Sequence, residues 1–503
     1  MLFLLSVAAL VMVAGFLWAT YCLRDRNPGY QLQLTIDGRK AKVDPRPLRV
    51  GFGRERINPS LSDPSRPVWL AGFSNGRAAT TIHDDLWAVA CVIDDGHTRL
   101  GIVALDTIGF FHDDVISVRR HLGSDLKLDY TIICSLHNHS TPDLMGIWGK
   151  SILKSGVDPQ YRHLVESATV NALSQAVTAV QPARLSLHEI PVPTAGLVAD
   201  TRKPEVFDPN LRLMIFTNPT NNHAIGSVVG WANHPETPWA HNTEVTADFP
   251  GVLRQVLENG VVINGQVQMP GLGGIHLYVN GAVGGLMTTH PSTTVHDPFL
   301  NQDFSKPSHE KSRAVGHQLA QRILQHLAAH EQGRGEAASS ACPAATDSAP
   351  ITINARTVEL PVDNVNFLLA PLLGVLDRGH VRWKTIRSEV AVLTIGDASI
   401  ACIPGELYPE IANGGVVRAP GGDFDIDPVE VPPIRDLMPG KVKFLFGLAN
   451  DEIGYIIPKS EWDQKPPYLF NSEKPVYGEI NSLGPNTAPL LHQTIRELCA
   501  SLR

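Results

Sequence analysis

The stretch from Tyr130 to Asp143 constrains the fold more than any other part of the sequence. An apolar run rich in β-forming residues, 130–136, breaks into His137-Asn138-His139-Ser140-Thr141-Pro142-Asp143. The run predicts a strand, and a proline ends such a strand because it cannot donate a ladder hydrogen bond. Residues two apart in an extended chain point to one side, so we expect His137 and His139 to face the same point beyond the strand. This pattern is typical of a metal site, although His-x-His also occurs where both rings only hydrogen-bond to backbone.

Two further apolar runs end in residues that could join such a site. The run 224–231 predicts a strand that leads into Asn233-His234-Pro235-Glu236-Thr237. The run 399–403 leads into Pro404-Gly405-Glu406, where the carboxylate either reaches a shared site or is simply favoured near the start of a helix. Ligands collected at strand ends are what a metal hydrolase site in an α/β fold requires.

Runs of strand length alternate with amphipathic helical patterns through most of the chain. This alternation predicts an α/β fold with mixed β-sheets flanked by helices. The segment 331–350 is rich in Ala, Ser, Gly and Pro and predicts a flexible linker or insertion. We therefore expect two intimately packed subdomains, 48–330 and 351–503, with the site shared between them.

The first 23 residues differ in kind from the rest. They carry no charged side chain and are long enough to cross a bilayer as a helix. A basic start and a clear cleavage site, which mark secretory signals, are not evident. The sequence therefore predicts a transmembrane anchor at 1–23, followed by a linker at 24–47. The basic residues after the anchor would keep that flank in the cytoplasm by the positive-inside rule: Arg24, Arg26, Arg39, Lys40, Lys42, Arg46 and Arg49.

Composition excludes some functions and leaves others open. With 503 residues, 43% of them hydrophobic, the chain can bury a large core. The net charge of -8, without a long basic run, gives no electrostatic reason to bind nucleic acid. Cys91, Cys134 and Cys402 lie inside apolar runs, which predicts buried free thiols rather than catalytic ones. The oligomeric state remains open.

Seven separated motifs, in this order, resemble those of the neutral/alkaline (non-lysosomal) ceramidase family. The resemblance is greatest to bacterial proteins that carry only the N-terminal catalytic domain and lack the C-terminal immunoglobulin-like domain, and it extends from about residue 48 onward. The motifs are Ile82-His83-Asp84-Asp85-Leu86, 137–143, 233–237, Ala247-Asp248-Phe249-Pro250-Gly251, Asn280-Gly281-Ala282-Val283-Gly284-Gly285, 404–406 and Gly447-Leu448-Ala449-Asn450.

The resemblance implies a set of site residues. A catalytic Zn²⁺ would be held by His137, His234, Glu406 and Tyr455. His139 would lie beside the metal and assist proton transfer or hold the substrate oxygen. Arg202 matches an arginine of the substrate pocket. The family also implies an extracytoplasmic catalytic domain, which opposes the positive-inside expectation.

The chain also departs from the family pattern. Gly284 or Gly285 stands where ceramidases have a serine that is implicated in catalysis. Zinc chemistry does not need that serine, because zinc lowers the pKa of bound water to about 7 and polarises a carbonyl. The sequence thus predicts a membrane-anchored zinc-dependent hydrolase of amide bonds in a lipid-like (ceramide-like) or other amphipathic substrate. The alternatives are a tethered binding protein on the same fold and a zinc hydrolase of a non-lipid substrate.

Overall fold

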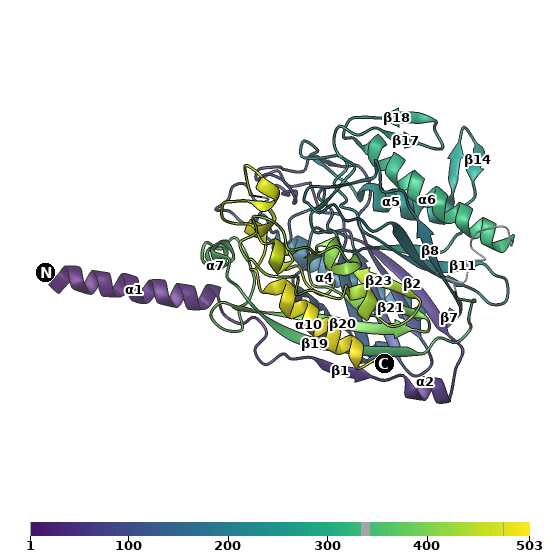
Figure 1. Cartoon of the computed structure of the whole chain (residues 1–503), viewed down its shortest axis with the longest axis horizontal. Coiled ribbons are helices and arrows are strands. Elements are labelled where there is room, and N and C mark those ends of the chain that lie inside the picture. The colour runs from purple at the N-terminus through teal and green to yellow at the C-terminus, as the bar shows by residue number, and fades with distance from the viewer. Residues whose placement is uncertain (1, 333–342, 476, 503) are drawn as a thin grey trace.

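Three β-sheets form the centre of the protein, which a computed structural model describes over residues 2–332, 343–475 and 477–502 (Figure 1). The first sheet has the order β6-β5-β4-β2-β7, and β5 and β6 are its parallel pair. Helix α4 (Pro159–Thr178) packs on this sheet, beginning at Pro159 with Asp158 as its cap. The strands are β2 (Arg49–Arg56), β4 (Trp87–Asp94), β5 (Arg99–Leu105), β6 (Tyr130–Ser135) and β7 (Gln181–Pro182).

The second sheet has the order β15-β11-β10-β8, in which only β11 and β15 run parallel. Its strands are β8 (Arg184–Pro191), β10 (Asn210–Thr217), β11 (Ala224–Trp231) and β15 (Ile275–Asn280). Helix α5 (Asp248–Asn259) packs on β15, and α6 (His309–Glu331) packs on α5 and reaches β8.

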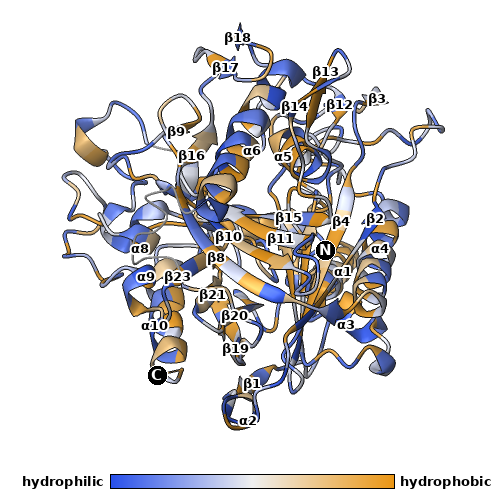
Figure 2. Cartoon of the chain, turned by 90° about the vertical axis from the view of Figure 1, so that its right-hand side faces the viewer, coloured by the Kyte–Doolittle hydropathy of each residue, from blue (hydrophilic) through white to orange (hydrophobic). Residues whose placement is uncertain are grey.

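The third sheet has the order β1-β19-β20-β21-β23, with β21 and β23 parallel. Its strands are β1 (Gln33–Ile36), β19 (Ile351–Pro361), β20 (Thr385–Ile395), β21 (Ala398–Cys402) and β23 (Val442–Phe446). Helix α10 (Thr487–Ala500) covers β19 and β20. One apolar core joins the inner faces of all three sheets, and Figure 2 shows these apolar strands between flanking helices. The fold is therefore α/β with mixed sheets flanked by helices, as predicted.

The remaining elements are short. The helices are α2 (Arg39–Val43), α3 (His112–His121), α7 (Val365–Leu372), α8 (Pro409–Asn413) and α9 (Ile434–Leu437). Paired short strands are β3 (Thr81–Ile82) with β12 (Glu244–Val245), β9 (Val198–Asp200) with β16 (Leu286–Thr288), β13 (Val261–Ile263) with β14 (Gln266–Met269), β17 (Val295–Asp297) with β18 (Gln302–Phe304), and β22 (Glu406–Leu407) with β24 (Tyr455–Ile456).

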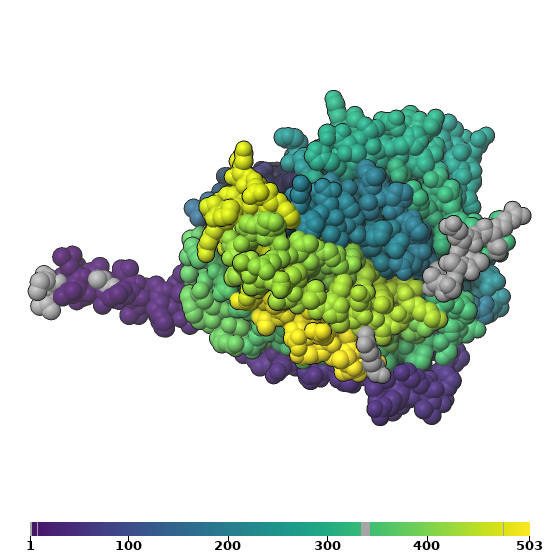
Figure 3. All heavy atoms as spheres, in the orientation of Figure 1, coloured from purple at the N-terminus to yellow at the C-terminus, as the bar shows by residue number. Residues whose placement is uncertain are grey.

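The N-terminal helix α1 (Leu2–Cys22) projects from the rounded body (Figures 1 and 3). It is apolar and long enough to cross a membrane, a test that a signal sequence would also pass. Its base is held by the hydrogen bond from Trp18 Nε1 to the carbonyl of Leu372, 2.8 Å long, at the end of α7. The following segment 24–47, predicted as a linker, contains β1, which pairs with β19.

Cys91, Cys134 and Cys402 are buried free thiols, as predicted. Each lies on a strand whose residues are nearly all buried. Half of the predicted linker 331–350, the residues 333–342, lies outside the described residues. The division into two subdomains therefore stays a prediction.

Candidate metal centre

The first histidine pair follows β6, but not in the predicted geometry. The strand ends at Ser135, and His137 has a φ of 60°, in the left-handed region. The alternation of an extended chain therefore does not account for the directions of the two rings. A turn does so instead: the Asn138 side chain accepts a hydrogen bond from the Ser140 amide (2.9 Å) and donates one to the carbonyl of Thr246 (2.8 Å). This turn brings the rings of His137 and His139 to a centroid distance of 5.0 Å.

His234 completes a buried group of three histidines. It follows β11, and its ring lies 4.9 Å from that of His137 and 5.5 Å from that of His139. One nitrogen from each ring lies within 4.8 Å of the others, a spacing that could hold a metal ion. All three side chains are buried. Histidines that are distant in sequence thus meet beyond the carboxyl ends of two strands, β6 and β11.

Glu406 faces two of these rings. Its Oε2 lies 3.3 Å from Nε2 of His137 and 3.1 Å from Nε2 of His234. The parallel pairing of β22 with β24 sets Glu406 directly beside Tyr455, and the Tyr455 hydroxyl hydrogen-bonds to its carboxylate. The four residues that the resemblance to ceramidases implies as ligands therefore converge at one place.

The tautomer of His137 bears on what lies between its ring and the Glu406 carboxylate. Its Nδ1 donates a hydrogen bond to the carbonyl of Ile108 (2.8 Å), so the neutral ring presents a lone pair at Nε2. That lone pair faces Oε2 of Glu406, which is also an acceptor when ionised. Two acceptors at 3.3 Å repel unless a proton or a cation lies between them. The spacing fits a zinc ligand pair, because tetrahedral ligands at about 2.0–2.1 Å from zinc are about 3.3 Å apart.

Burial controls the protonation of the group. Desolvation lowers the pKa of His137 to about 4 and that of His234 to about 3. Desolvation also raises the pKa of Glu406. Neutral imidazoles are the form that binds metal ions, and Nδ1 of His234 is a buried atom without a hydrogen bond to any described residue. The donor set therefore fits a zinc-class ion.

His139 has different surroundings. Its Nδ1 lies 3.3 Å from Oε2 of Glu236, and burial raises the pKa of Glu236 to about 8. Phe73 packs edge-on against the ring, at a centroid distance of 5.0 Å. Gly72 has a φ of +98°, and a Cβ there would lie 2.4 Å from Cγ of His139. The backbone can approach the ring only because residue 72 is glycine.

Arg202 lies in a neighbouring cluster of charged groups. It is buried, forms an ion pair with Glu479 at 3.0 Å and donates a hydrogen bond to the carbonyl of Glu461. Its guanidinium also lies 4.9 Å from the ring centroid of Tyr408, whose ring is 5.9 Å from that of Tyr455. These contacts connect Arg202 to the site through an aromatic pair. Its role in substrate binding stays a prediction.

The glycine loop after β15 packs directly on the strand that carries Glu406. The amide of Gly284 donates a hydrogen bond to the carbonyl of Leu407 (2.9 Å). A Cβ at Gly284 would lie 2.6 Å from the carbonyl oxygen of Glu406 and 2.6 Å from Cδ2 of Tyr408. Gly285 has a φ of +75°. Neither position can carry a serine without displacing its neighbours.

Sequence reasoning missed two residues of the site. Glu236 stands in the quoted motif 233–237, two residues after His234, and that spacing was its only signal. Tyr477 carried none: its hydroxyl lies 3.0 Å from that of Tyr455, although it comes from a short 3-10 helix near the C-terminus, Tyr477–Asn481. Tyr477 is 49% exposed, so it forms part of the rim between the buried group and solvent.

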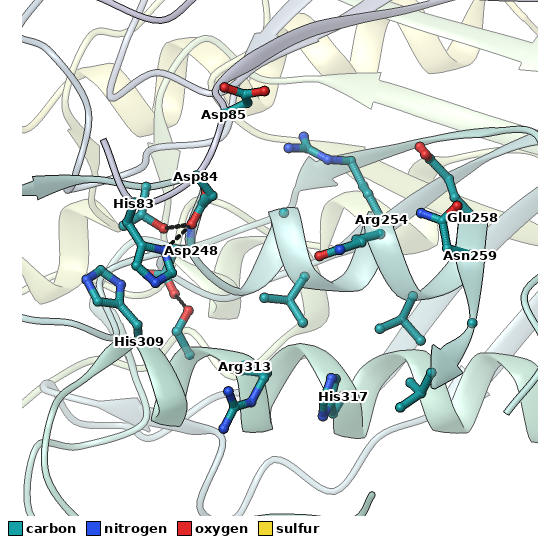
Figure 4. Close-up of a pocket in the computed structure, with 18 of the residues that line it drawn as sticks. His83, Asp84, Asp85, Asp248, Arg254, Glu258, Asn259, His309, Arg313 and His317 are labelled. Carbon is teal, nitrogen blue, oxygen red and sulfur yellow. Dashed lines mark hydrogen bonds and ion pairs between the residues drawn. The ribbon is translucent and has the colours of Figure 1, made fainter. Parts of the chain in front are cut away.

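A cavity of about 850 Å³ lies next to this group, between α5, α6 and the edge of the first sheet (Figure 4). The three histidines do not line it. Its inner wall includes Asp248, whose carboxylate accepts a hydrogen bond from the amide of Thr237 (2.8 Å). The cavity thus ends behind the segment that carries His234 and Glu236.

Comparison with solved structures identifies the fold as ceramidase-like. Neutral ceramidase from Pseudomonas aeruginosa matches with a TM-score of 0.65 and 15% identity, over 91% of this chain and 74% of that one. A ceramidase complexed with C2 matches with a TM-score of 0.64 and 15% identity, over 91% and 75% of the two chains. No family model and no curated protein sequence matches the chain. At 15% sequence identity, the likeness to these structures shows a shared fold.

Proposed function

We propose that the protein is a zinc-dependent hydrolase of amide bonds in lipid-like substrates. His137, His234, Glu406 and Tyr455 would hold the ion. The observation that carries the proposal is the lone pair of His137 Nε2 directed at Oε2 of Glu406, 3.3 Å away, with His234 Nε2 3.1 Å from the same oxygen. The ceramidase-like fold supports the choice of an amide bond.

Different residues of the protein would have different roles in hydrolysis. When bound, zinc polarises the amide carbonyl and lowers the pKa of water. His139 lies at the metal group but contacts Glu236, so it is free to move a proton. Hydrolysis breaks the C–N bond and adds the water oxygen to the acyl carbon. His139 would take the proton from that water and deliver it to the departing amine nitrogen, while Glu236 orients the imidazole through Nδ1.

The exposed apolar face of α7 supports a lipid-like substrate. Val365, Leu369 and Leu373 are 60%, 49% and 55% exposed, next to the base of α1. We call these three residues the α7 patch. The Asn364 side chain, which caps α7, donates a hydrogen bond to the carbonyl of Ile480 (2.9 Å). Ile480 lies three residues after Tyr477 on the rim of the site. A bilayer holding α1 would therefore meet the α7 patch close to the site entrance.

One observation favours a second candidate, a membrane-tethered binding protein without turnover. Gly284 offers no hydroxyl, and its surroundings exclude one. Such a protein would bind an amphipathic amide and leave it intact.

A paired assay tests the proposal. The full chain in detergent micelles is analysed for zinc and incubated with a ceramide-like amide, whose fatty-acid product is quantified. We expect about one zinc at the centre and zinc-dependent release of fatty acid. Binding without release would favour the second candidate, and a folded protein that takes up no zinc at His137 and His234 would refute the hydrolase.

A further inference from the structure

A second group of histidines lies at β8, the edge strand of the second sheet, outside the metal centre. His326 and His330 are four residues apart on α6 and therefore share one face of the helix. His188 comes from β8, beneath that face. The ring of His188 lies 5.2 Å from that of His326 and 5.1 Å from that of His330, centroid to centroid. A helical i, i+4 histidine pair with a third ligand from elsewhere is a recurrent arrangement for binding zinc.

Two nitrogen atoms of this group, one from His188 and one from His326, are already at ligand spacing. Nδ1 of His188 lies 3.2 Å from Nε2 of His326. Two nitrogens bound to one tetrahedral zinc at about 2.0–2.1 Å lie about 3.3 Å apart, so an ion fits between them with little movement of either ring. His330 is exposed near the end of the helix, and turning its side chain would bring a third nitrogen to the ion.

Burial keeps His188 and His326 in their metal-binding form. His188 is 2% exposed. Desolvation, followed by the nearby His326 and His330, lowers the pKa of His188 to about 4, and desolvation also lowers the pKa of His326. His188 and His326 are therefore largely neutral at pH 7, as ligand imidazoles must be.

We propose that His188, His326 and His330 form a second binding site for a zinc-class divalent ion. This site would join α6 to β8 and so fix the helix that forms one wall of the cavity in Figure 4. The role is structural, because the ion would connect two elements that meet chiefly through side chains. The competing explanation of the 3.2 Å contact is a hydrogen bond between two neutral rings.

Zinc stoichiometry tests this site separately from the metal centre. The full chain in detergent micelles is stripped with chelator, dialysed against micromolar zinc and analysed for bound metal. We expect two zinc ions in the wild type, one in His330→Ala, one in His137→Ala and none in the double variant. His163→Ala removes another exposed helical histidine, on α4, and serves as the control that keeps two. Circular dichroism checks that each variant is folded.

The outcomes separate the two proposals. One zinc in the wild type that survives His330→Ala overturns the second site and leaves the hydrolase proposal intact. One zinc that survives His137→Ala but is lost in His330→Ala supports the second site and refutes the hydrolase. Two ions that persist in His330→Ala overturn the assignment to these histidines.

A thermal measurement tests the structural role. In the His137→Ala background, zinc should raise the melting temperature, because a ligand that binds only the folded state stabilises it. The rise should vanish when His330→Ala is added and persist with His163→Ala. A zinc-dependent rise that His330→Ala leaves unchanged would overturn the proposed connection between α6 and β8.

Discussion

At the residue scale, the first prediction concerns the ion itself. His137→Ala removes one of four proposed ligands, so zinc at the centre and amide hydrolysis should be lost together. Elemental analysis and the fatty-acid assay measure the two on one sample. Chelation of the wild type should abolish hydrolysis in the same way, and added zinc should restore it. Hydrolysis that continues at the wild-type rate in zinc-free His137→Ala would contradict the proposed mechanism.

His139→Ala should behave differently from His137→Ala. The ring contacts Glu236 rather than Glu406, and we propose that it transfers a proton. We expect zinc at the centre to stay near full occupancy while turnover falls by roughly a hundredfold to ten-thousandfold. Equal loss of zinc in both variants would make His139 a ligand, as the spacing of the three histidine nitrogens also permits.

Gly284→Ser tests whether this loop can carry the serine that the resemblance to ceramidases places there. A Cβ there would lie 2.6 Å from the carbonyl oxygen of Glu406, so the strand that carries this ligand must shift. We expect no gain in turnover and a loss of stability of about 1–3 kcal/mol, the usual cost of overpacking. Gly265→Ser is the control for a new serine, since Gly265 lies on a β-turn with open space around it, although its positive φ adds some strain. A faster Gly284→Ser enzyme would contradict this reading of the loop.

The sequence predicted the identity of the converging residues better than their geometry. His137, His139 and His234 were recognisable because each follows an apolar run and precedes a proline. The left-handed φ of His137 left no such signal, because the turn depends on the Asn138 side chain and its contact with Thr246. Tyr477 could not be predicted, since only the tertiary fold brings its segment to Tyr455.

At the element scale, the long strands were predictable and the short ones were not. β4, β5 and β6 are buried and consist mainly of apolar residues, and an apolar run of this length can be recognised in the sequence. β1 has only four residues with alternating exposure, so its pairing with β19 was hidden in a predicted linker. β22 and β24 have two residues each, yet their pairing aligns Glu406 with Tyr455.

Asp208 joins the second sheet to α9 and should control stability at acid pH. Burial raises the pKa of its carboxyl, but Arg435 and Arg212 outweigh that effect and hold the pKa below its ordinary value. A lowered folded-state pKa gives stability that is present above the unfolded pKa of about 3.9 and is lost as pH falls through the folded value. Asp208→Asn should cost about 3–5 kcal/mol at pH 7, because it removes the carboxylate that pairs with the buried guanidinium of Arg435 and weakens the pairing of Arg212, which keeps Glu189.

Chemical denaturation from pH 7 down to pH 3 measures this effect. The wild type should lose stability below about pH 4, and Asp208→Asn should lose less over that range because the group no longer titrates. Asp347→Asn breaks an exposed pair with Arg184 and is the matched control, with only a small expected change. An Asp208→Asn protein as stable as the wild type at pH 7 would refute the argument.

At the scale of the whole molecule, the three sheets explain why distant motifs meet. The strands β6, β11, β15, β21 and β23 end close to one another. The segment that follows each of these strands carries part of the site. Backbone contacts join these segments: the Ser135 amide donates to the carbonyl of Leu448 (3.1 Å), and the Gly447 amide donates to that of Asn280 (2.9 Å). Motif order alone could not reveal this meeting point, because it depends on which sheet edges face one another.

The last prediction concerns the membrane. Deleting residues 1–23 should leave a folded protein that no longer sediments with membranes, because the apolar helix makes few contacts with the body beyond α7. An intact mass that begins near Arg24 in the mature wild type would instead identify the segment as a cleaved signal.

In the anchored protein, Leu369→Glu and Leu373→Glu together should slow hydrolysis of an amide embedded in vesicles but spare a short-chain soluble amide. The reason is that charges on the α7 patch resist insertion into the bilayer, whereas the zinc ligands are untouched. Leu164→Glu on α4, at an exposed leucine outside the patch, should slow neither reaction. Equal slowing of both substrates by the α7 variant would mean that the patch supports the fold of the site rather than its contact with lipid.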